Sequence, residues 1–564
     1  MGNSNLKNRN DIPDKYKWNI DKMYASASLC EEDMKYASEL AKDFTKFKNH
    51  LGDSYDKLAD ALEINDKIGL MLERSFAYAH MKLDEDNRNS EYQALLDKSI
   101  QTISKVSALM SFVTPELISI PEDKLLEYIK KPRLQVYKHM LTDILRKKAH
   151  VLTDKEEEIM AQLGEVLGSS DNLFSMLNDA DIKFGAIHDE NDKLIELTHG
   201  NYVTFLKSYN RKVREEAFDR CYETYGNLIN TLSANYANNV KINVITSRIR
   251  KYDSPRAAAL SGGDIPESVY DNLVAIVNKN LPTLHEYISI RKKLLGYSEL
   301  KMHDIYVPLV QIKEKKIPFD KACEIAINGL SPLGEEYIRE FKNGLKSGWI
   351  DIYENQGKTS GAYSFGSYDS APYILLNYNN RLQDVFTLVH EMGHSMNSLY
   401  TRNAQPLVYG DHSIFTAEVA STVNEVLLMK YLLEKEEDME MRKYILNMYI
   451  EGFRTTLFRQ TMFAEFEKLS HDYVQKGGSL TADWLNNTYD SLNTKYFGPD
   501  LFHDDLIKYE WARIPHFYRS FYVYQYATGY SAANAIADKI LTEGEPARNA
   551  YIEFLKCGTN DYPV

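Results

Sequence analysis

The chain has few cysteines and no long apolar run, and both absences narrow what it can be. Its four cysteines in 564 residues are Cys30, Cys221, Cys323 and Cys557. They lie far apart and form no C-x-x-C pair, so we expect reduced thiols and neither a disulfide framework nor a zinc cage. No stretch approaches the roughly 18 consecutive apolar residues of a membrane span. The first six residues are polar and lack the apolar core of a signal peptide. These features predict a cytoplasmic protein outside the membrane.

An excess of basic residues is also missing. The formal net charge is -14 and the isoelectric point is near 5.6. Binding to phosphate groups would need a basic surface, so the composition argues against nucleic acid and anionic membranes as partners. Domains usually span about 100 to 200 residues, so a chain of this length should form two or more lobes.

The first 180 residues have an almost wholly helical pattern. Asp56–Lys82 and Ser90–Phe112 are long amphipathic segments with one glycine and no proline. Two short apolar segments joined by Asp189-Glu-Asn-Asp192 predict a β-hairpin over 181–197. We place a domain boundary after this hairpin, so that residues 1–199 form an N-terminal helical lobe and 200–564 a second domain.

Three further segments predict a small sheet in the second domain: Ile350–Tyr353, Gly361–Gly366 and Tyr373–Leu376. An extended peptide could add to the edge of such a sheet through main-chain hydrogen bonds. Gly361, Ala362 and Tyr363 are the candidate substrate-binding residues on that edge. The alternative is a purely structural sheet that supports the helix that follows it.

That helix carries the sequence His390-Glu-Met-Gly-His394, an H-E-x-x-H pattern. Residues i and i+4 project from the same helix face, so His390 and His394 can bind one metal ion. Glu391 lies about 100° further round the helix, where it can accept a proton from an attacking water. An apolar stripe at helical spacing runs beside these residues and consists of Val385, Val389, Met392, Met396 and Leu399.

A third metal ligand must come from elsewhere, because the positions of a metzincin glycine and histidine hold Asn397 and Tyr400. A second helical pattern begins near Ser413 and offers Glu418 in its first turns. Two histidines and one glutamate leave a fourth coordination position for water, as catalytic zinc requires. Glu425 lies two turns after Glu418 and could orient a ligand imidazole; the alternative is an ordinary solvated carboxylate.

A tyrosine-rich stretch near the C-terminus repeats its tyrosines every four residues, at Tyr518, Tyr522, Tyr526 and Tyr530. On one helix these side chains would share a face. Such a row can be simple packing. Together with His516, however, the hydroxyls could donate hydrogen bonds to an oxyanion.

These motifs together resemble oligoendopeptidase F, a branch of the thimet oligopeptidase-like zinc peptidases. His390–His394, Ala417–Glu425 and Pro372–Tyr378 match the family pattern, as does the stretch from Ile514 to Gly529. The resemblance runs in order from about residue 200 to the end. It implies one zinc ion per chain, with His390, His394 and Glu418 as ligands and Glu391 as general base. It also implies catalytic roles for His516, Tyr522 and Tyr526.

The sequence departs from the family pattern at two places. Asn397 stands where many members carry histidine, a position outside the metal ligands. The chain also stops at Val564, where relatives usually continue for some tens of residues.

We therefore predict an elongated, mainly α-helical, zincin-like peptidase with a small sheet beside the metal helix and an N-terminal helical lobe. Its predicted function is zinc-dependent hydrolysis of internal bonds in short peptides. One alternative is a dipeptidyl carboxypeptidase, whose relatives also carry H-E-M-G-H and a glutamate 24 residues after the second histidine. Another is a catalytically silent peptide-binding homologue.

Overall fold

The computed structural model describes residues 6–312 and 315–564, and the polar residues 1–5 lie outside this part of the chain. The chain forms two compact units, each built from separate segments. The first contains residues 1–149, 313–435 and 532–563, and the second contains residues 150–312 and 436–531. The boundary predicted after residue 199 stays a prediction.

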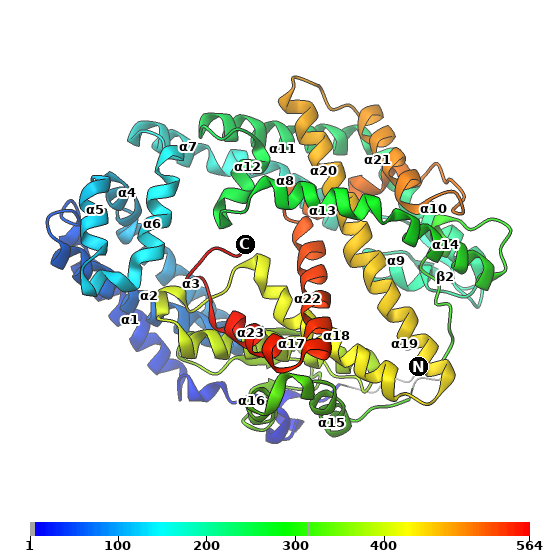
Figure 1. The fold of residues 1–564 in the computed structure, drawn as a ribbon, viewed down its shortest axis with the longest axis horizontal. Helices are drawn as coiled ribbons and strands as arrows, with labels where there is room; N and C mark the ends of the chain where they lie inside the picture. The colour runs from blue at the N-terminus through cyan, green and yellow to red at the C-terminus, as the bar shows by residue number, and fades with distance from the viewer. Residues whose placement is uncertain (1–5, 313–314) are drawn as a thin grey trace. The chain divides into compact units, whose positions relative to one another are not determined.

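The first unit is mainly helical with one small sheet (Figure 1). Its helices are α1 Ala27–Phe44, α2 Tyr55–Glu85, α3 Ser90–Met110, α4 Val113–Ser119, α5 Glu122–Ile129, α6 Lys138–Lys147, α15 Phe319–Gly329, α16 Gly334–Lys346, α17 Leu382–Ala404, α18 Ile414–Lys435 and α23 Glu545–Lys556. Two of the long helices predicted from the sequence, α2 and α3, are confirmed within three residues at each end.

The second unit is also mainly helical. Its helices are α7 Asp154–Leu167, α8 Ser169–Ser175, α9 His199–Leu206, α10 Arg211–Asn227, α11 Ile229–Ile249, α12 Pro255–Leu260, α13 Glu267–Lys279, α14 Leu281–Leu295, α19 Met439–Gly452, α20 Arg459–Gln475 and α21 Ala482–Phe497. The predicted hairpin is confirmed as strands β1 Ala186–His188 and β2 Leu194–Glu196, which pair antiparallel with Ile187 opposite Ile195. Helix α22, Tyr524–Glu543, starts in the second unit and ends in the first.

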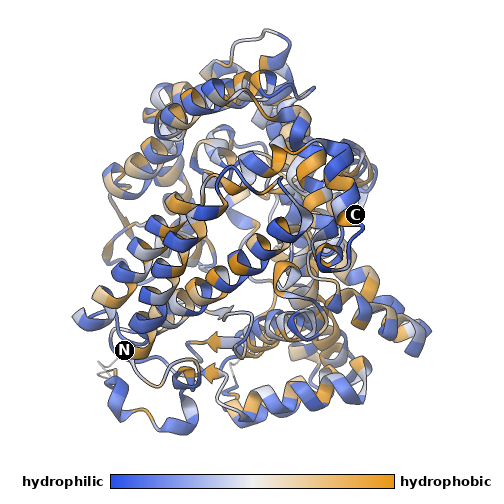
Figure 2. Ribbon diagram, turned by 90° about the vertical axis from the view of Figure 1, so that its left-hand side faces the viewer, coloured by the Kyte–Doolittle hydropathy of each residue, from blue (hydrophilic) through white to orange (hydrophobic). Residues whose placement is uncertain are grey.

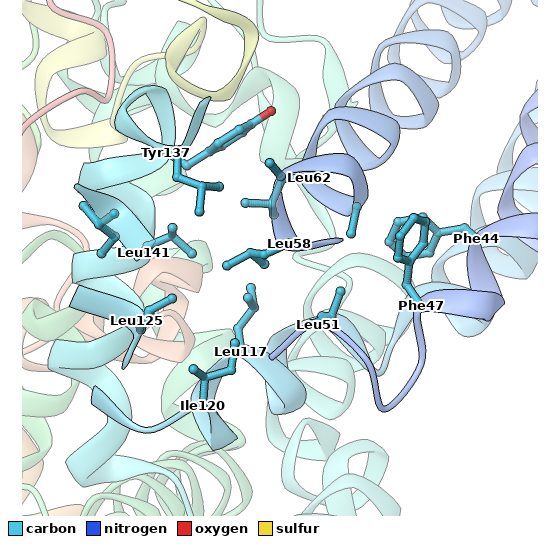
Figure 3. Close-up of a cluster of buried hydrophobic side chains, with 14 of the residues drawn as sticks. Phe44, Phe47, Leu51, Leu58, Leu62, Leu117, Ile120, Leu125, Tyr137 and Leu141 are labelled. Carbon is cyan, nitrogen blue, oxygen red and sulfur yellow. The ribbon is translucent and has the colours of Figure 1, made fainter. Parts of the chain in front are cut away.

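Amphipathic helices explain how the N-terminal part of the first unit forms a core. Figure 2 shows hydrophilic and hydrophobic residues along the same helices, as expected when one face packs inward. Side chains from α1 to α6 and from the turns between them meet in one cluster (Figure 3). Among them, Leu58, Leu125 and Leu141 have no exposed surface. Burying a leucine contributes about 1.5–3 kcal/mol, so this cluster is a main source of stability for the lobe.

No single helix in the described part of the chain is long and apolar enough to cross a membrane. Two consecutive helical segments, Ser90–Ser119 and Glu122–Ile129, together have the length and apolar composition of a membrane span, but the chain bends by 103° between them. In the structure, Val106, Leu117 and Leu125 from this pair belong to the buried cluster of Figure 3.

The four cysteines are free thiols, as predicted. Cys30 and Cys221 are buried, but Cys557 is exposed.

The small sheet of the first unit has the strand order β3-β5-β4. Strand β5, Tyr373–Leu375, is central and fully buried, and it pairs parallel with β3, Ile350–Asp351. Strand β4, Tyr363–Phe365, pairs antiparallel with β5 and lies at an edge of the sheet. The predicted sheet is confirmed, with strands shorter than the segments that predicted it. Its edge strand β4 packs against α17.

Candidate metal centre

Helices α17 and α18 pack along one another and carry the candidate metal ligands (Figure 1). Helix α17 begins after the N-cap residue Arg381. The carboxylate of Asp384 explains this start, because it accepts hydrogen bonds from the backbone N–H groups of Asn379 and Arg381. The two predicted helices are thus confirmed.

Donor atoms from the two helices converge on one point. Nε2 of His390 lies 3.5 Å from Oε2 of Glu418, and Nε2 of His394 lies 3.7 Å from the same oxygen. Ligand atoms at about 2.1 Å from one tetrahedral ion would lie about 3.4 Å apart. Within the described residues, this is the His/Cys/Asp/Glu group whose ligand atoms all lie within 4.8 Å of one another. The three side chains therefore fit a tetrahedral metal ion.

Gly393 sets the distance between the two helices. A Cβ atom built on Gly393 would lie 2.6 Å from Cα of Ser421 and 2.8 Å from the carbonyl oxygen of Ala420, so no larger residue fits. Buried Asn424 fixes the contact further, because its amide donates a hydrogen bond to the carbonyl oxygen of Val389 at 3.0 Å. Because the two backbones lie close together, the side chain of Glu418 on α18 can reach both histidines on α17.

We expect Gly393→Ala to weaken metal binding although it changes no ligand. The added methyl group would push against the α18 backbone and move Glu418 away from the histidines. Isothermal titration calorimetry, with zinc added to the metal-free variant, measures the change in zinc affinity. Gly69→Ala is the matched control, because Gly69 also lies inside a helix but a Cβ atom there meets nothing within 4 Å. Equal zinc affinity in both variants would contradict the spacing argument.

Two of the three candidate ligands, His390 and Glu418, are also held by a second group. Oε1 of Glu425 lies 3.4 Å from Nδ1 of His390, which leaves Nε2 of His390 directed to Glu418. The hydroxyl of Ser421 donates a hydrogen bond to Oε2 of Glu418 at 3.0 Å. A carboxylate that holds the far nitrogen of a histidine fixes its tautomer and increases its basicity. The geometry thus supports the predicted orienting role of Glu425.

Burial and neighbouring charges shift the pKa values of the two histidines in opposite directions. Burial lowers the pKa of His394 to about 3, and the charge of His390 adds to this effect. His394 is therefore neutral and able to bind a cation. Burial also disfavours the charged form of His390, but the hydrogen bond and charge of Glu425, with the charges of Glu391 and Glu418, raise its pKa to about 9. A metal ion must displace that proton when it binds.

Glu391 lies beside the cluster in a buried position, with 7% of its surface exposed. Burial raises the pKa of its carboxyl group to about 7, an effect that the charge of His390 opposes and the charges of Glu418 and Glu425 reinforce. A hydrogen bond from the backbone N–H of Ser364, on edge strand β4, favours the charged form. A carboxylate with a pKa near neutrality can both accept and return a proton.

The candidate substrate-binding residues lie before and on β4. Gly361 adopts a positive φ of 85°, a conformation that favours glycine, and it lines a pocket of about 380 Å³ with Ala362 and with Thr387 of α17. Tyr363 is different, since its hydroxyl donates a hydrogen bond to Asp84 at 2.5 Å. Gly361 and Ala362 are thus accessible next to α17, whereas the Tyr363 hydroxyl is bound to Asp84 of α2 and stabilises the fold.

The tyrosine-rich stretch does not form the single helix that its spacing predicts, so this prediction is wrong. Tyr518 ends a 3₁₀ turn, Pro515–Tyr518, and α22 begins only at Tyr524. Phe521 interrupts the row with a positive φ of 59°. Tyr518 stacks on Phe174 instead, with ring centroids 4.6 Å apart. Tyr518 therefore has a packing role.

The structure nevertheless brings His516, Tyr522 and Tyr526 together within the second unit. The hydroxyl of Tyr526 lies 3.3 Å from Nε2 of His516. The rings of Tyr522 and Tyr526 meet edge to face at 5.4 Å, and the Tyr522 ring lies parallel to His516 at 6.2 Å. Burial and the charges of two arginines lower the pKa of His516, so its imidazole is neutral at pH 7. All three side chains are partly exposed.

The fold and the His-His-Glu cluster on α17 and α18 define a mainly helical metallopeptidase of the H-E-x-x-H class. A family model described as peptidase family M3 matches residues 204–564, and one described as oligopeptidase F matches residues 116–184. The chain belongs to peptidase family M3. The resemblance that its motifs indicated is thereby confirmed.

Individual relatives agree with this assignment. Oligopeptidase PepF of Bacillus subtilis is 48% identical over 560 residues, which cover 99% of this chain and 84% of the relative. The crystal structure of oligoendopeptidase-F from Enterococcus faecium is 39% identical, with a TM-score of 0.73 over 95% of this chain and 92% of that one. A crystal structure from Chlamydophila abortus is 35% identical, with a TM-score of 0.92 over 99% of this chain and 94% of that one.

Several residues that hold the site were missed by reasoning from sequence. Gly393 and Asn424 set the helix contact, Ser421 orients Glu418, and Asp84 holds Tyr363. Gly393 had a signal, because an interior glycine in a long helix indicates close packing. Ser421 also had a local signal, because it lies three residues after Glu418 on the same helix. Asn424 and Asp84 had none, since their partners lie far away in the sequence.

Proposed function

We propose that this chain is a zinc-dependent endopeptidase that hydrolyses internal bonds of short oligopeptides. Membership of peptidase family M3 and 48% identity to an oligopeptidase support a metalloendopeptidase that cleaves oligopeptides. The observation that carries the proposal is the convergence of His390, His394 and Glu418 at distances that suit a tetrahedral ion. We assign one zinc ion per chain to these three ligands, and we assign the protein to the cytoplasm.

Glu391 is the proposed general base. When bound at His390, His394 and Glu418, zinc would act as a Lewis acid that polarises the scissile carbonyl and lowers the pKa of water, so that water can attack as it loses a proton. Glu391 accepts the proton of the attacking water and then donates it to the leaving amine. Burial raises the pKa of its carboxyl group to about 7, which suits a group that accepts and returns a proton. The Ser364 N–H, which also contacts Glu391, would keep the carboxylate oriented during both transfers.

We assign the substrate backbone to the edge of β4. An extended peptide would pair there through its main-chain groups, with Gly361 and Ala362 at one end of the paired segment. Pairing of this kind holds a peptide without reading its side chains. The pocket of about 380 Å³ beside these residues would accommodate one substrate side chain.

His516, Tyr522 and Tyr526 are the proposed donors to the oxyanion that forms when the carbonyl is attacked. We expect Tyr522→Phe or Tyr526→Phe to lower kcat by about 10²- to 10³-fold with KM nearly unchanged, because such a donor acts mainly in the transition state. His516→Ala should have a similar effect. Steady-state kinetics measure kcat and KM, and thermal melts show whether each variant keeps its stability.

The matched control for these variants is Tyr518→Phe, which removes a hydroxyl from the same stretch. The Tyr518 hydroxyl accepts a hydrogen bond from Asn235 at 3.2 Å. Its loss should lower the free energy of unfolding by about 1 kcal/mol and leave kcat alone. Wild-type kcat in Tyr522→Phe, Tyr526→Phe and His516→Ala would remove all three from the mechanism.

A digest of a mixed peptide library, analysed by mass spectrometry with and without a chelator, tests the proposed function. We expect cleavage at internal bonds, complete loss of cleavage with chelator, and recovery when zinc is added back. Release of dipeptides from free C-termini alone would identify a dipeptidyl carboxypeptidase instead. Absence of any chelator-sensitive cleavage would identify a silent peptide-binding homologue.

A further inference from the structure

Phe521 has the strained backbone that interrupts the tyrosine-rich stretch. Its φ of 59° lies in the left-handed region, which a bulky residue adopts only when its surroundings hold it there. The residue is 97% buried, and its ring packs against His471 of α20 and Tyr270 of α13, at centroid distances of 4.6 and 5.8 Å. Strained residues cluster at functional sites. Phe521 directly precedes Tyr522.

One buried carboxyl group holds this turn. Oε1 of Glu467 accepts a hydrogen bond from the backbone N–H of Phe521 at 2.6 Å. Glu467 has no exposed surface, and no arginine or lysine pairs with it in the hydrogen bonds and ion pairs of the described residues. Burial raises the pKa of Glu467 well above its usual range, so the group is a neutral acid. Burying an acid without a charged partner lowers the free energy of unfolding, so we expect this side chain to have a specific role that offsets the loss.

The other side of the same segment is held by two asparagines of α11. They are spaced four residues apart and therefore share one helix face. Asn239 donates to the carbonyl oxygen of Phe517, and Asn243 donates to the hydroxyl of Ser520. The chain from residue 517 to 521 is thus fixed on one side by α11 and on the other by Glu467 of α20.

The geometry points to Glu467 as a positioning residue that acts through the Phe521 turn to hold Tyr522 and Tyr526 against His516. This inference rests on the proposed function, because it assigns a consequence for the reaction to the placement of those three side chains. Glu467 itself takes no part in proton transfer. Its task is to accept one hydrogen bond in a place where water cannot, so that the left-handed turn persists.

A pair of substitutions separates the acceptor from the rest of the side chain. Glu467→Gln keeps an acceptor oxygen for the Phe521 N–H and resembles the neutral acid in size and charge, so we expect kcat and KM near wild type. Glu467→Leu removes the acceptor. A catalytic group displaced by about 1 Å can cost about 10²-fold in rate, so we expect a loss of that order in kcat with little change in KM.

A control on the same helix distinguishes positioning from stability. Ser470→Ala removes a buried hydroxyl that lies 2.8 Å from the Tyr236 hydroxyl, one turn away from Glu467. It should lower the melting temperature and leave kcat unchanged. The double variant Glu467→Leu with Tyr522→Phe adds a sharper test. If Glu467 acts through Tyr522, the double variant should be about as slow as the slower single variant, whereas independent effects would multiply.

Hydrogen exchange at the Phe521 amide gives a readout that does not depend on activity. We expect slow exchange in wild type and Glu467→Gln, and faster exchange in Glu467→Leu. Unchanged exchange in Glu467→Leu overturns the inference, as does unchanged kcat in Glu467→Leu when Tyr522→Phe is slow. Wild-type kcat in Tyr522→Phe, Tyr526→Phe and His516→Ala would also overturn it, and would at the same time refute the oxyanion role. The chelator-sensitive digest tests the metal-dependent function separately.

Discussion

Replacing Glu391 with glutamine should leave the metal content of the protein unchanged and lower kcat by about 10²- to 10⁴-fold. The substitution keeps His390, His394 and Glu418, whose three donor atoms form the cluster, so the ion should still bind. Glutamine cannot accept the proton of the attacking water. Glutamine also has nearly the same size as Glu391, which is 93% buried, so the surrounding packing should be unchanged.

Metal analysis and steady-state kinetics on the same preparation measure the two effects together. Glu434→Gln is a suitable control, since Glu434 lies at the exposed end of α18 and pairs with Lys435. It makes the same chemical change without touching the cluster. Full metal content with substantial residual turnover in Glu391→Gln would show that another group acts as the base.

Glu418→Ala should lower the affinity for zinc by more than about 100-fold. Loss of a group that only orients a ligand typically costs about 10- to 100-fold, and loss of a ligand should cost more. Oε2 of Glu418 lies 3.5 Å from Nε2 of His390 and 3.7 Å from Nε2 of His394. Without it, two histidines one helical turn apart would hold the ion alone.

Glu425→Ala is the matched comparison, because Glu425 lies on the same helix and its Oε1 lies 3.4 Å from Nδ1 of His390, the ring nitrogen that faces away from Glu418. We expect its zinc affinity to fall between those of wild type and Glu418→Ala. Titration of the metal-free proteins with zinc gives this ranking, and added zinc should restore more activity to Glu425→Ala than to Glu418→Ala. The reverse order would make Glu425 the ligand and Glu418 the orienting residue.

Much of the site could be predicted because its geometry is local. His390 and His394 share a helix face whatever the rest of the chain does, since four residues make about one helical turn. The apolar spacing of α17 and α18 likewise predicted both helices, and the strand patterns before α17 predicted the sheet. In each case the residues that interact are neighbours in sequence or repeat with the period of the element.

The sequence by itself thus determined the helical class and the two-histidine motif, and it placed Glu391, the proposed general base, beside them, because each depends on chemistry and spacing within one element. The tertiary structure alone decided what depends on contacts between elements. Gly393 and Asn424 bring Glu418 to the histidines, and no periodicity in α18 could show that distance. The left-handed backbone of Phe521 broke the four-residue tyrosine row, which removed Tyr518 from the group and kept Tyr522 and Tyr526 together. That backbone persists because buried Glu467, 54 residues earlier in the chain, accepts its N–H.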